Sequence, residues 1–144
     1  MFTEKTIRAS TVGVQEEHRA LRDLLGQVGT AIASPRCGHR QWSNLMQTLR
    51  DQLAGHFRHE EEGGYFREVV TAAPWLGKQA SSLEQEHALL RARIDDLVAS
   101  RFNDRSRVEL QDQFQTFCEL LLAHEVRENN LVQQSLCDDL GSAD

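Results

Sequence analysis

Apolar residues recur at alternating steps of four and three along four long stretches of this chain. In the second stretch, Trp42, Met46, Leu49 and Leu53 follow that spacing. Such steps keep side chains on one face of an α-helix, so each stretch predicts an amphipathic helix that packs lengthwise against its neighbours. The predicted long helices cover about 14–33, 39–62, 78–101 and 105–140, and a short extra helix at about 65–72 lies within a connection at 63–77.

Turn-forming residues separate these helices. Ser34-Pro35-Arg36-Cys37-Gly38 and Asn103-Asp104 are short turns, and Gly63-Gly64 opens the longer connection that holds the short helix. Four helices joined in this way form an all-α, antiparallel, up-down-up-down four-helix bundle. A chain of 144 residues fits one domain, predicted to span 1–144 with a bundle core at about 14–140.

The second half of the chain repeats the first. The spacing from Val14 to Val28 recurs from Leu83 to Leu97 at an offset of 69 residues. The spacing that ends at Glu60 recurs, at an offset of 68, in a pattern that ends at Glu128. This internal two-fold repeat of helix hairpins predicts a pseudo-two-fold axis along the bundle.

Polar residues interrupt the apolar face of every predicted long helix. Each face carries one histidine, and two faces add a glutamate four residues later: His18, His56 with Glu60, His87, and His124 with Glu128. A spacing of four residues places both side chains on one helix face, about 6 Å apart along the axis. The four histidines lie 16 to 20 residues from their turns at one end of the bundle, or about 24–30 Å, so they are level with one another.

A level set of four imidazoles and two carboxylates in a core favours a metal centre over four separate core histidines. Burying two carboxylates costs several kcal/mol unless cations compensate their charge. A donor set without thiolates suits Fe, Mn or Zn. The repeat places His18 with His56 on one ion and His87 with His124 on a second, and Glu60 and Glu128 lie between the ions, where they can bridge them.

Four stretches of the sequence resemble the hemerythrin family, in its HHE cation-binding branch. They are Glu17-His18-Arg19-Ala20-Leu21-Arg22, His56-Phe57-Arg58-His59-Glu60-Glu61, Glu86-His87-Ala88-Leu89-Leu90-Arg91 and His124-Glu125-Val126-Arg127-Glu128. The resemblance implies a non-haem di-iron centre with an oxo or hydroxo bridge, four terminal histidines and the two bridging glutamates. Ferritin-like di-iron proteins fit less well, because they need two ExxH motifs and this chain has only the one that ends at His87.

The sequence departs from the oxygen carriers of that family at two positions. Arg91 stands where carriers have a fifth histidine, and Asn129 stands where they have a bridging aspartate, Glu128 being one residue earlier. Both ions would then keep an open position. Three functions follow as hypotheses: binding of O₂ or another diatomic for transport, storage or sensing; a redox enzyme that reduces peroxide, NO or O₂; and iron handling or repair.

Several residues near the ligands have either a supporting role or an ordinary structural one. Glu125, Glu61, Glu17 and Glu86 are candidates for extra ligands, for acceptors of imidazole N–H bonds, or for solvated surface. His59 and His39 are predicted to be surface residues. The aromatic and apolar residues of the connection either cap the centre or only pack the short helix: Tyr65, Phe66, Trp75 and Leu76.

Composition limits the partners and the compartment. The net charge is −6, which makes nucleic acid an unexpected partner. No apolar run approaches the length of a membrane span, and the N-terminal residues lack the apolar core of a signal peptide. Cys37, Cys118 and Cys137 have no metal-binding spacing and are expected to be free thiols, so we expect a cytoplasmic protein whose partner is a small molecule.

Overall fold

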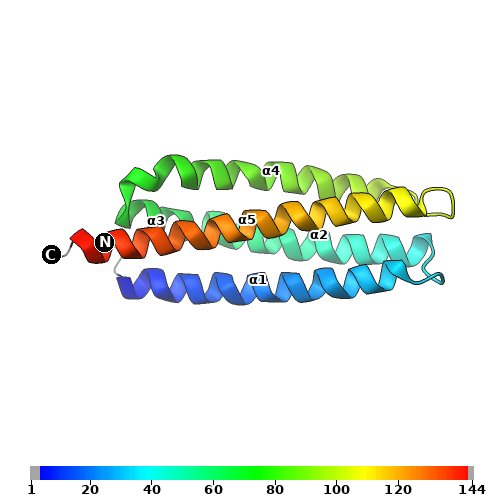
Figure 1. The fold of residues 1–144 in the computed structure, drawn as a ribbon, viewed down its shortest axis with the longest axis horizontal. Helices are drawn as coiled ribbons and strands as arrows, with labels where there is room; N and C mark the ends of the chain where they lie inside the picture. Colours follow the sequence, from blue (N-terminus) through cyan, green and yellow to red (C-terminus); the bar gives the residue numbers. More distant parts are fainter. Residues whose placement is uncertain (1–3, 143–144) are drawn as a thin grey trace.

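A computed structural model describes residues 4–142, with side chains described for 13–137. Its elements are α1 (Glu4–Ala33), α2 (His39–Glu62), α3 (Tyr65–Ala72), a 3-10 turn (Pro74–Leu76), α4 (Gly77–Ala99) and α5 (Arg107–Ser142). The four long helices run alternately up and down, and α3 lies at the end of the bundle where α1 begins and α5 ends (Figure 1). This is the predicted hemerythrin-like four-helix bundle.

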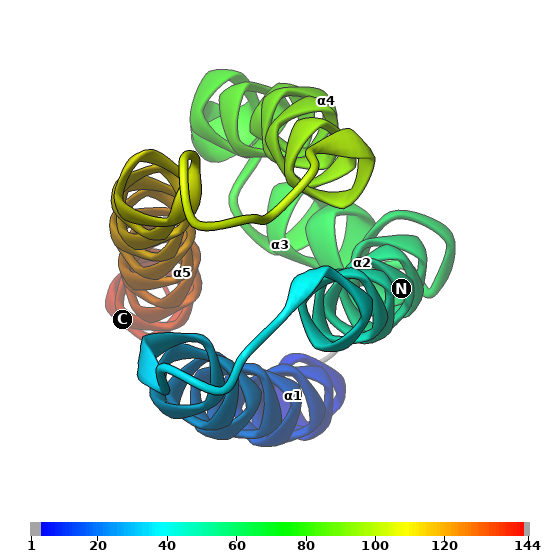
Figure 2. The same cartoon turned by 90° about the vertical axis from the view of Figure 1, so that its right-hand side faces the viewer.

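Each long helix packs against two others, in the order α1, α2, α4, α5 and back to α1 (Figure 2). The arrangement follows from the two hairpins: α1 with α2, and α4 with α5, are each joined by a short turn at the same end. The short α3 bridges the hairpins at the other end. Gly64, which begins α3, has φ +90°, a left-handed conformation that glycine adopts without strain.

Several helix ends differ from the predicted ones. Helix α1 begins at Glu4 and not near residue 14, because no proline stops it and Gly13 alone is tolerated within a helix. Helix α4 ends at Ala99, before Ser100 turns extended. Helix α5 starts at Arg107, because the side chain of Asn103 accepts bonds from the backbone N–H groups of residues 105 and 106 and holds a turn there. Residues 1–3 and 143–144 of the predicted domain lie outside the described residues.

Two apolar clusters divide the interior. The larger fills the bundle toward the two hairpin turns, where Trp42 stacks on Phe102 with ring centroids 4.7 Å apart and donates from its indole nitrogen to the Leu97 carbonyl at 3.1 Å. The smaller joins α3 to α1, α4 and α5 at the other end, around Val69 and Leu131. Along α1, α4 and α5 the predicted histidines fall between residues of the two clusters, so a polar layer separates them.

No described helix has the length and apolar character that crossing a bilayer requires. The three cysteines are free, Cys37 and Cys118 being buried and Cys137 exposed. Burial raises the pKa of Cys118 to about 11, so this thiol stays protonated at neutral pH.

Candidate metal centre

The polar layer brings together all six residues that the sequence singled out. Their exposed fractions lie between 0% and 5%: His18, His56, Glu60, His87, His124 and Glu128. One histidine comes from each long helix, and the two glutamates come from α2 and α5. Charged and imidazole side chains are rarely buried so completely without partners, so this layer is the feature of the core that needs a chemical explanation.

The donor atoms form two overlapping groups. One consists of His18, His56, Glu60 and Glu128, and the other of Glu60, His87, His124 and Glu128. Within each group, one atom from every residue lies within 4.8 Å of the others. The two histidine pairs are those that the repeat predicted, and both glutamates belong to both groups.

The Nε2 atoms of all four imidazoles face the two carboxylates. His56 Nε2 lies 2.9 Å from Glu60 Oε1, and His18 Nε2 lies 3.3 Å from Glu128 Oε2. His87 Nε2 lies 3.5 Å from Glu60 Oε1 and 3.7 Å from Glu128 Oε1. His124 Nε2 is the imidazole nitrogen closest to Glu128.

These atoms have no hydrogen bond of acceptable geometry among the described residues. The set includes the Nε2 atom of each imidazole and both oxygens of Glu60 and Glu128. Buried polar atoms are nearly always satisfied in folded proteins. Eight convergent, unsatisfied nitrogen and oxygen atoms are suitable ligands for a pair of cations, so the residues of the layer fit a metal centre.

Electrostatics give the same result. Burial, followed by the adjacent Glu128, raises the pKa of Glu60 to about 12. Burial opposes the charge on Glu128 as well, but the close approach of Glu60 and the imidazoles outweighs it and holds the pKa of Glu128 well below its ordinary value. Without a cation the two carboxyl groups therefore keep a proton between them, and a cation would displace it.

Carboxylates on neighbouring helices hold the outward nitrogen of three imidazoles. Glu17 lies 2.6 Å from His56 Nδ1, across the contact of α1 with α2. The other two contacts are Glu61 with His87 Nδ1 at 2.9 Å and Glu86 with His124 Nδ1 at 2.6 Å. A carboxylate at Nδ1 makes this atom the N–H donor and leaves Nε2 free to bind a metal. The candidates Glu17, Glu61 and Glu86 thus all contact imidazoles in this structure.

Arginines anchor two of these carboxylates from outside. Arg91 donates to Glu61 at 3.1 Å, and Arg127 donates to Glu86. Burial works against the charge of Glu61 and Glu86, but the bonds from imidazole and arginine prevail and lower the pKa of both groups. Both acceptors are therefore ionised at neutral pH.

The two histidines predicted to lie on the surface have local roles. His59 is 55% exposed and lies 2.7 Å from the second oxygen of Glu17. His39 accepts a bond from the backbone N–H of Phe102 at 3.2 Å, in the turn region far from the polar layer. Neither belongs to the two donor groups.

Aromatic rings cover the His87 side of the layer. Phe57 stacks on His87 with centroids 3.9 Å apart and planes 10° from parallel, and Phe66 lies 5.8 Å from the same imidazole. Tyr65 donates its hydroxyl to the Glu128 carbonyl at 3.2 Å. Of the connection residues expected either to cap the centre or to pack the short helix, Tyr65, Phe66 and Leu76 are buried and Trp75 is 59% exposed. The sequence reasoning did not single out Phe57, which lies one residue off the regular spacing.

Glu125 is the fourth candidate carboxylate, and it is buried to 2% exposure. Neither of its oxygens has a hydrogen-bond partner among the described residues. Burial raises its pKa to about 7, against the opposing charges of His18 and Arg22. It belongs to neither donor group.

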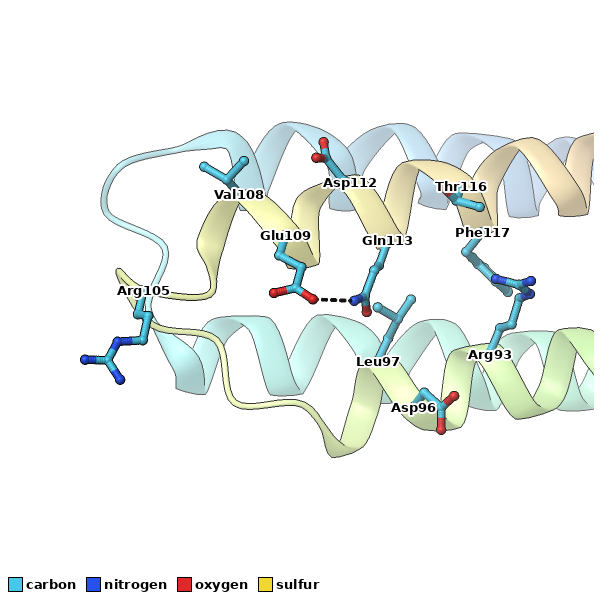
Figure 3. Close-up of a pocket in the computed structure, with 10 residues that line it drawn as sticks. All are labelled: Arg93, Asp96, Leu97, Arg105, Val108, Glu109, Asp112, Gln113, Thr116 and Phe117. Atoms are coloured by element: carbon cyan, nitrogen blue, oxygen red, sulfur yellow. Dashed lines mark hydrogen bonds between the residues drawn. The ribbon is translucent and has the colours of Figure 1, made fainter.

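A surface groove of about 800 Å³ lies between α4 and α5, toward their connecting turn (Figure 3). Its polar lining includes a bond from Gln113 to Glu109 at 3.4 Å. None of the six buried donors lines it. The groove is therefore separate from the buried donors of the polar layer.

Comparison with protein families gives one match that covers most of the chain. The model of the Hemerythrin HHE cation binding domain matches residues 12–136, a segment that contains all six buried donors. Comparisons with curated proteins and with solved structures gave no match. The matched segment, the four-helix bundle and the buried histidine–glutamate layer agree with one another, and the chain belongs to the hemerythrin HHE cation-binding domain family.

Proposed function

We propose that this protein binds two iron ions in its polar layer. At these ions it binds O₂ or another small diatomic or oxidant, and this serves reversible binding, sensing or storage of that molecule. The observation that carries the proposal is the pair of overlapping donor groups with Glu60 and Glu128 in common. His18, His56, Glu60, His87, His124 and Glu128 are the proposed ligands. Two carboxylates shared by two ions are a usual way to hold a pair of metals a few ångströms apart.

The donor set supports iron. Imidazole and carboxylate together suit Fe and Mn, and Zn also accepts them, whereas a soft-metal site would need thiolates. No cysteine belongs to either donor group. Bound iron would supply reversible one-electron chemistry toward O₂, peroxide or NO.

The count of protein donors leaves room for a small ligand. Each ion would receive two imidazoles and two shared carboxylates, fewer than the six positions that octahedral iron offers. Arg91, at the position where oxygen carriers have a fifth histidine, points instead to Glu61 and lies 5.3 Å from the centroid of the Phe57 ring. No fifth imidazole is therefore available from that position.

The surrounding residues orient the donors and limit access. Glu17, Glu61 and Glu86 fix three imidazoles with Nε2 toward the interior. Phe57 and Phe66 cover the His87 side with apolar surface that disfavours water. The proposed ligands are no more than 5% exposed, so the layer favours small, uncharged molecules as its partners.

The test is anaerobic loading of the metal-free protein with Fe²⁺, followed by metal analysis and visible spectra before and after air. We expect two irons per chain and an oxo-to-iron charge-transfer band that develops in air. The Glu60→Gln variant should bind little iron, while the exposed Glu119→Gln variant should match the unmodified protein. A protein that binds no iron, or one zinc unchanged by air, would overturn the di-iron proposal.

The second candidate is a redox enzyme that reduces peroxide, NO or O₂ with electrons from an external donor. The absence of a fifth imidazole favours it, because open positions on both ions suit reaction more than reversible carriage. Repeated, stable cycles between deoxygenated and oxygenated spectra would support binding. Steady consumption of peroxide or NO with a supplied reductant would support the enzyme. Iron handling or repair, the third hypothesis, has less support than these two functions.

We propose the cytoplasm as the location of the protein, because three free cysteines fit a reducing compartment.

A further inference from the structure

Carboxylate–imidazole contacts join neighbouring helices around the polar layer. Glu17 on α1 reaches His56 on α2, Glu61 on α2 reaches His87 on α4, and Glu86 on α4 reaches His124 on α5. Each contact runs from one helix to the next in the circular order α1, α2, α4, α5, which Figure 2 shows end-on. All three are made by the Nδ1 atom of the imidazole, and among the described residues only the contact between α5 and α1 lacks a carboxylate at an imidazole Nδ1.

Two unsatisfied groups belong to this fourth contact. His18 on α1 is the one member of the four imidazoles whose Nδ1 atom has no hydrogen-bond partner among the described residues. Glu125 on α5 is a carboxylate with both oxygens in the same condition. Their residues are 1% and 2% exposed, so bulk water does not satisfy them. A buried donor and a buried acceptor on adjacent helices are each costly to leave unpaired.

The internal repeat explains why the fourth acceptor comes from an unexpected position. By the offset of 68, the equivalent of Glu61 is Asn129, so α5 lacks a carboxylate there. The equivalent of Phe57 is Glu125. Phe57 lies on the imidazole of His87, and the repeat therefore places Glu125 against the equivalent imidazole, His18. The carboxylate has moved by one helical turn, from the position of Glu61 to that of Phe57.

The arginines follow the same symmetry. Arg91, four residues after His87, binds the carboxylate that holds His87. Arg22 stands four residues after His18, and the charges of His18 and Arg22 both act on Glu125, where they oppose the effect of burial on its pKa. The trio of Arg22, Glu125 and His18 thus corresponds to the trio of Arg91, Glu61 and His87.

We propose that Glu125 is the hydrogen-bond acceptor for Nδ1–H of His18 and completes the ring of carboxylate–imidazole contacts. Glu125 is then a positioning residue, which turns Nε2 of His18 toward Glu60 and Glu128. The effect on metal binding rests on the proposed function, while the contact itself belongs to the folded chain.

The proposal also makes the two metal positions different. The His87 imidazole has an aromatic ring on its face and an acceptor at Nδ1. The His18 imidazole would have a carboxylate in place of both. The two positions would then have equal numbers of carboxylates behind their imidazoles, and they would differ in what covers the face of one imidazole.

The test is nuclear magnetic resonance of the ¹⁵N-histidine-labelled protein, with and without Zn²⁺ as a diamagnetic probe. We expect His18 to carry a proton on Nδ1 that exchanges slowly with water in the unmodified protein. In Glu125→Leu, exchange of that proton should become at least about tenfold faster, and the other three imidazoles should keep their spectra. Glu125→Gln retains an acceptor oxygen and should restore part of the protection. Glu61→Leu is the matched control and should change His87 alone.

Zinc titration by calorimetry supplies the second readout. Glu125→Leu should weaken one of two zinc sites by about 10- to 100-fold, the usual effect of losing an acceptor behind a ligand histidine. An unchanged His18 spectrum in Glu125→Leu would overturn the proposal, whether or not affinity falls; a fall without that change would mean that the carboxylate binds the ion itself. Failure of the unmodified protein to bind any metal would overturn the proposed function, while the metal-free spectra would still decide the contact.

Discussion

Glu60 Oε1 lies 2.9 Å from Nε2 of His56 on its own helix and 3.5 Å from Nε2 of His87 on the next. One carboxylate thus meets imidazoles from both halves of the repeat, and Glu128 does the same from the opposite side. Two acidic groups at the centre of a bundle are unfavourable unless they hold cations or protons.

Replacing either shared carboxylate should remove both ions. Glu60→Gln and Glu128→Gln each take a donor from both groups, so we expect most of the bound iron to be lost in either variant, as measured by metal analysis after gel filtration. Glu119→Gln, on the exposed side of α5, is the control and should bind iron as the unmodified protein does. Full occupancy in either core variant would contradict the assignment of bridging ligands.

The metal-free protein should lose stability as the pH rises. Burial and Glu128 raise the pKa of Glu60 from 4.5 to about 12. Between those values the folded chain holds a proton that the unfolded chain has released, so the free energy of unfolding falls by up to about 1.4 kcal/mol per pH unit. Urea unfolding at about pH 6 and about pH 9 measures the effect.

Two comparisons identify the source of that slope. Glu60→Gln should flatten the profile, and bound metal should flatten it too, because the ion replaces the proton. The lowered pKa of Glu86 acts in a different window, since its stabilisation is present above pH 4.5 and is lost as the pH falls below that value. If the metal-free protein had the same free energy of unfolding at the higher and the lower pH of the urea experiment, the shared proton would be contradicted.

Glu17→Leu should weaken metal binding without removing a ligand. The carboxylate of Glu17 fixes His56 at 2.6 Å, and loss of such an acceptor lowers metal affinity by about 10- to 100-fold. His59 contacts the other oxygen of Glu17 but is 55% exposed. His59→Ala is therefore the control, and it should change affinity little in a calorimetric titration. Equal losses in both variants would show that Glu17 acts through His59.

Trp42→Phe should destabilise the fold while leaving the metal count unchanged. The indole N–H bonds the Leu97 carbonyl in the buried turn region, and the ring stacks on Phe102. Losing that bond and part of the ring should lower the free energy of unfolding by about 1–3 kcal/mol. Thermal unfolding gives the stability and metal analysis gives the count. Lost metal in a folded Trp42→Phe protein would show that the two regions are coupled.

The sequence predicted the bundle and the six buried donors because both depend on helical spacing. A histidine at a core position of a regular helix must be buried, whichever way the helices are arranged. The partners of Glu17 and Glu86 were harder to predict, since each contacts the histidine of the following helix and not its own neighbour in sequence. That choice depends on how the helices are rotated against one another.

Other contacts left no signal in the spacing. Phe57 stacks on His87 from a position beside the regular apolar face. Arg107 donates to the Cys37 carbonyl at 2.7 Å and lies 4.6 Å from the centroid of the Phe102 ring, a contact that the spacing does not indicate. The early start of α1 was also missed, because residues 4–13 continue the helix without the apolar period that marked the rest.

The placement of the polar layer between two apolar clusters has a consequence for how a cation is captured. Packing on both sides organises the donors when the chain folds, before any ion arrives. Toward a metal the bundle then behaves as a macrocycle does in coordination chemistry, and not as an open-chain chelator. Binding needs little further ordering of the donors, so loss of a bound ion should be slow even where its equilibrium affinity is moderate.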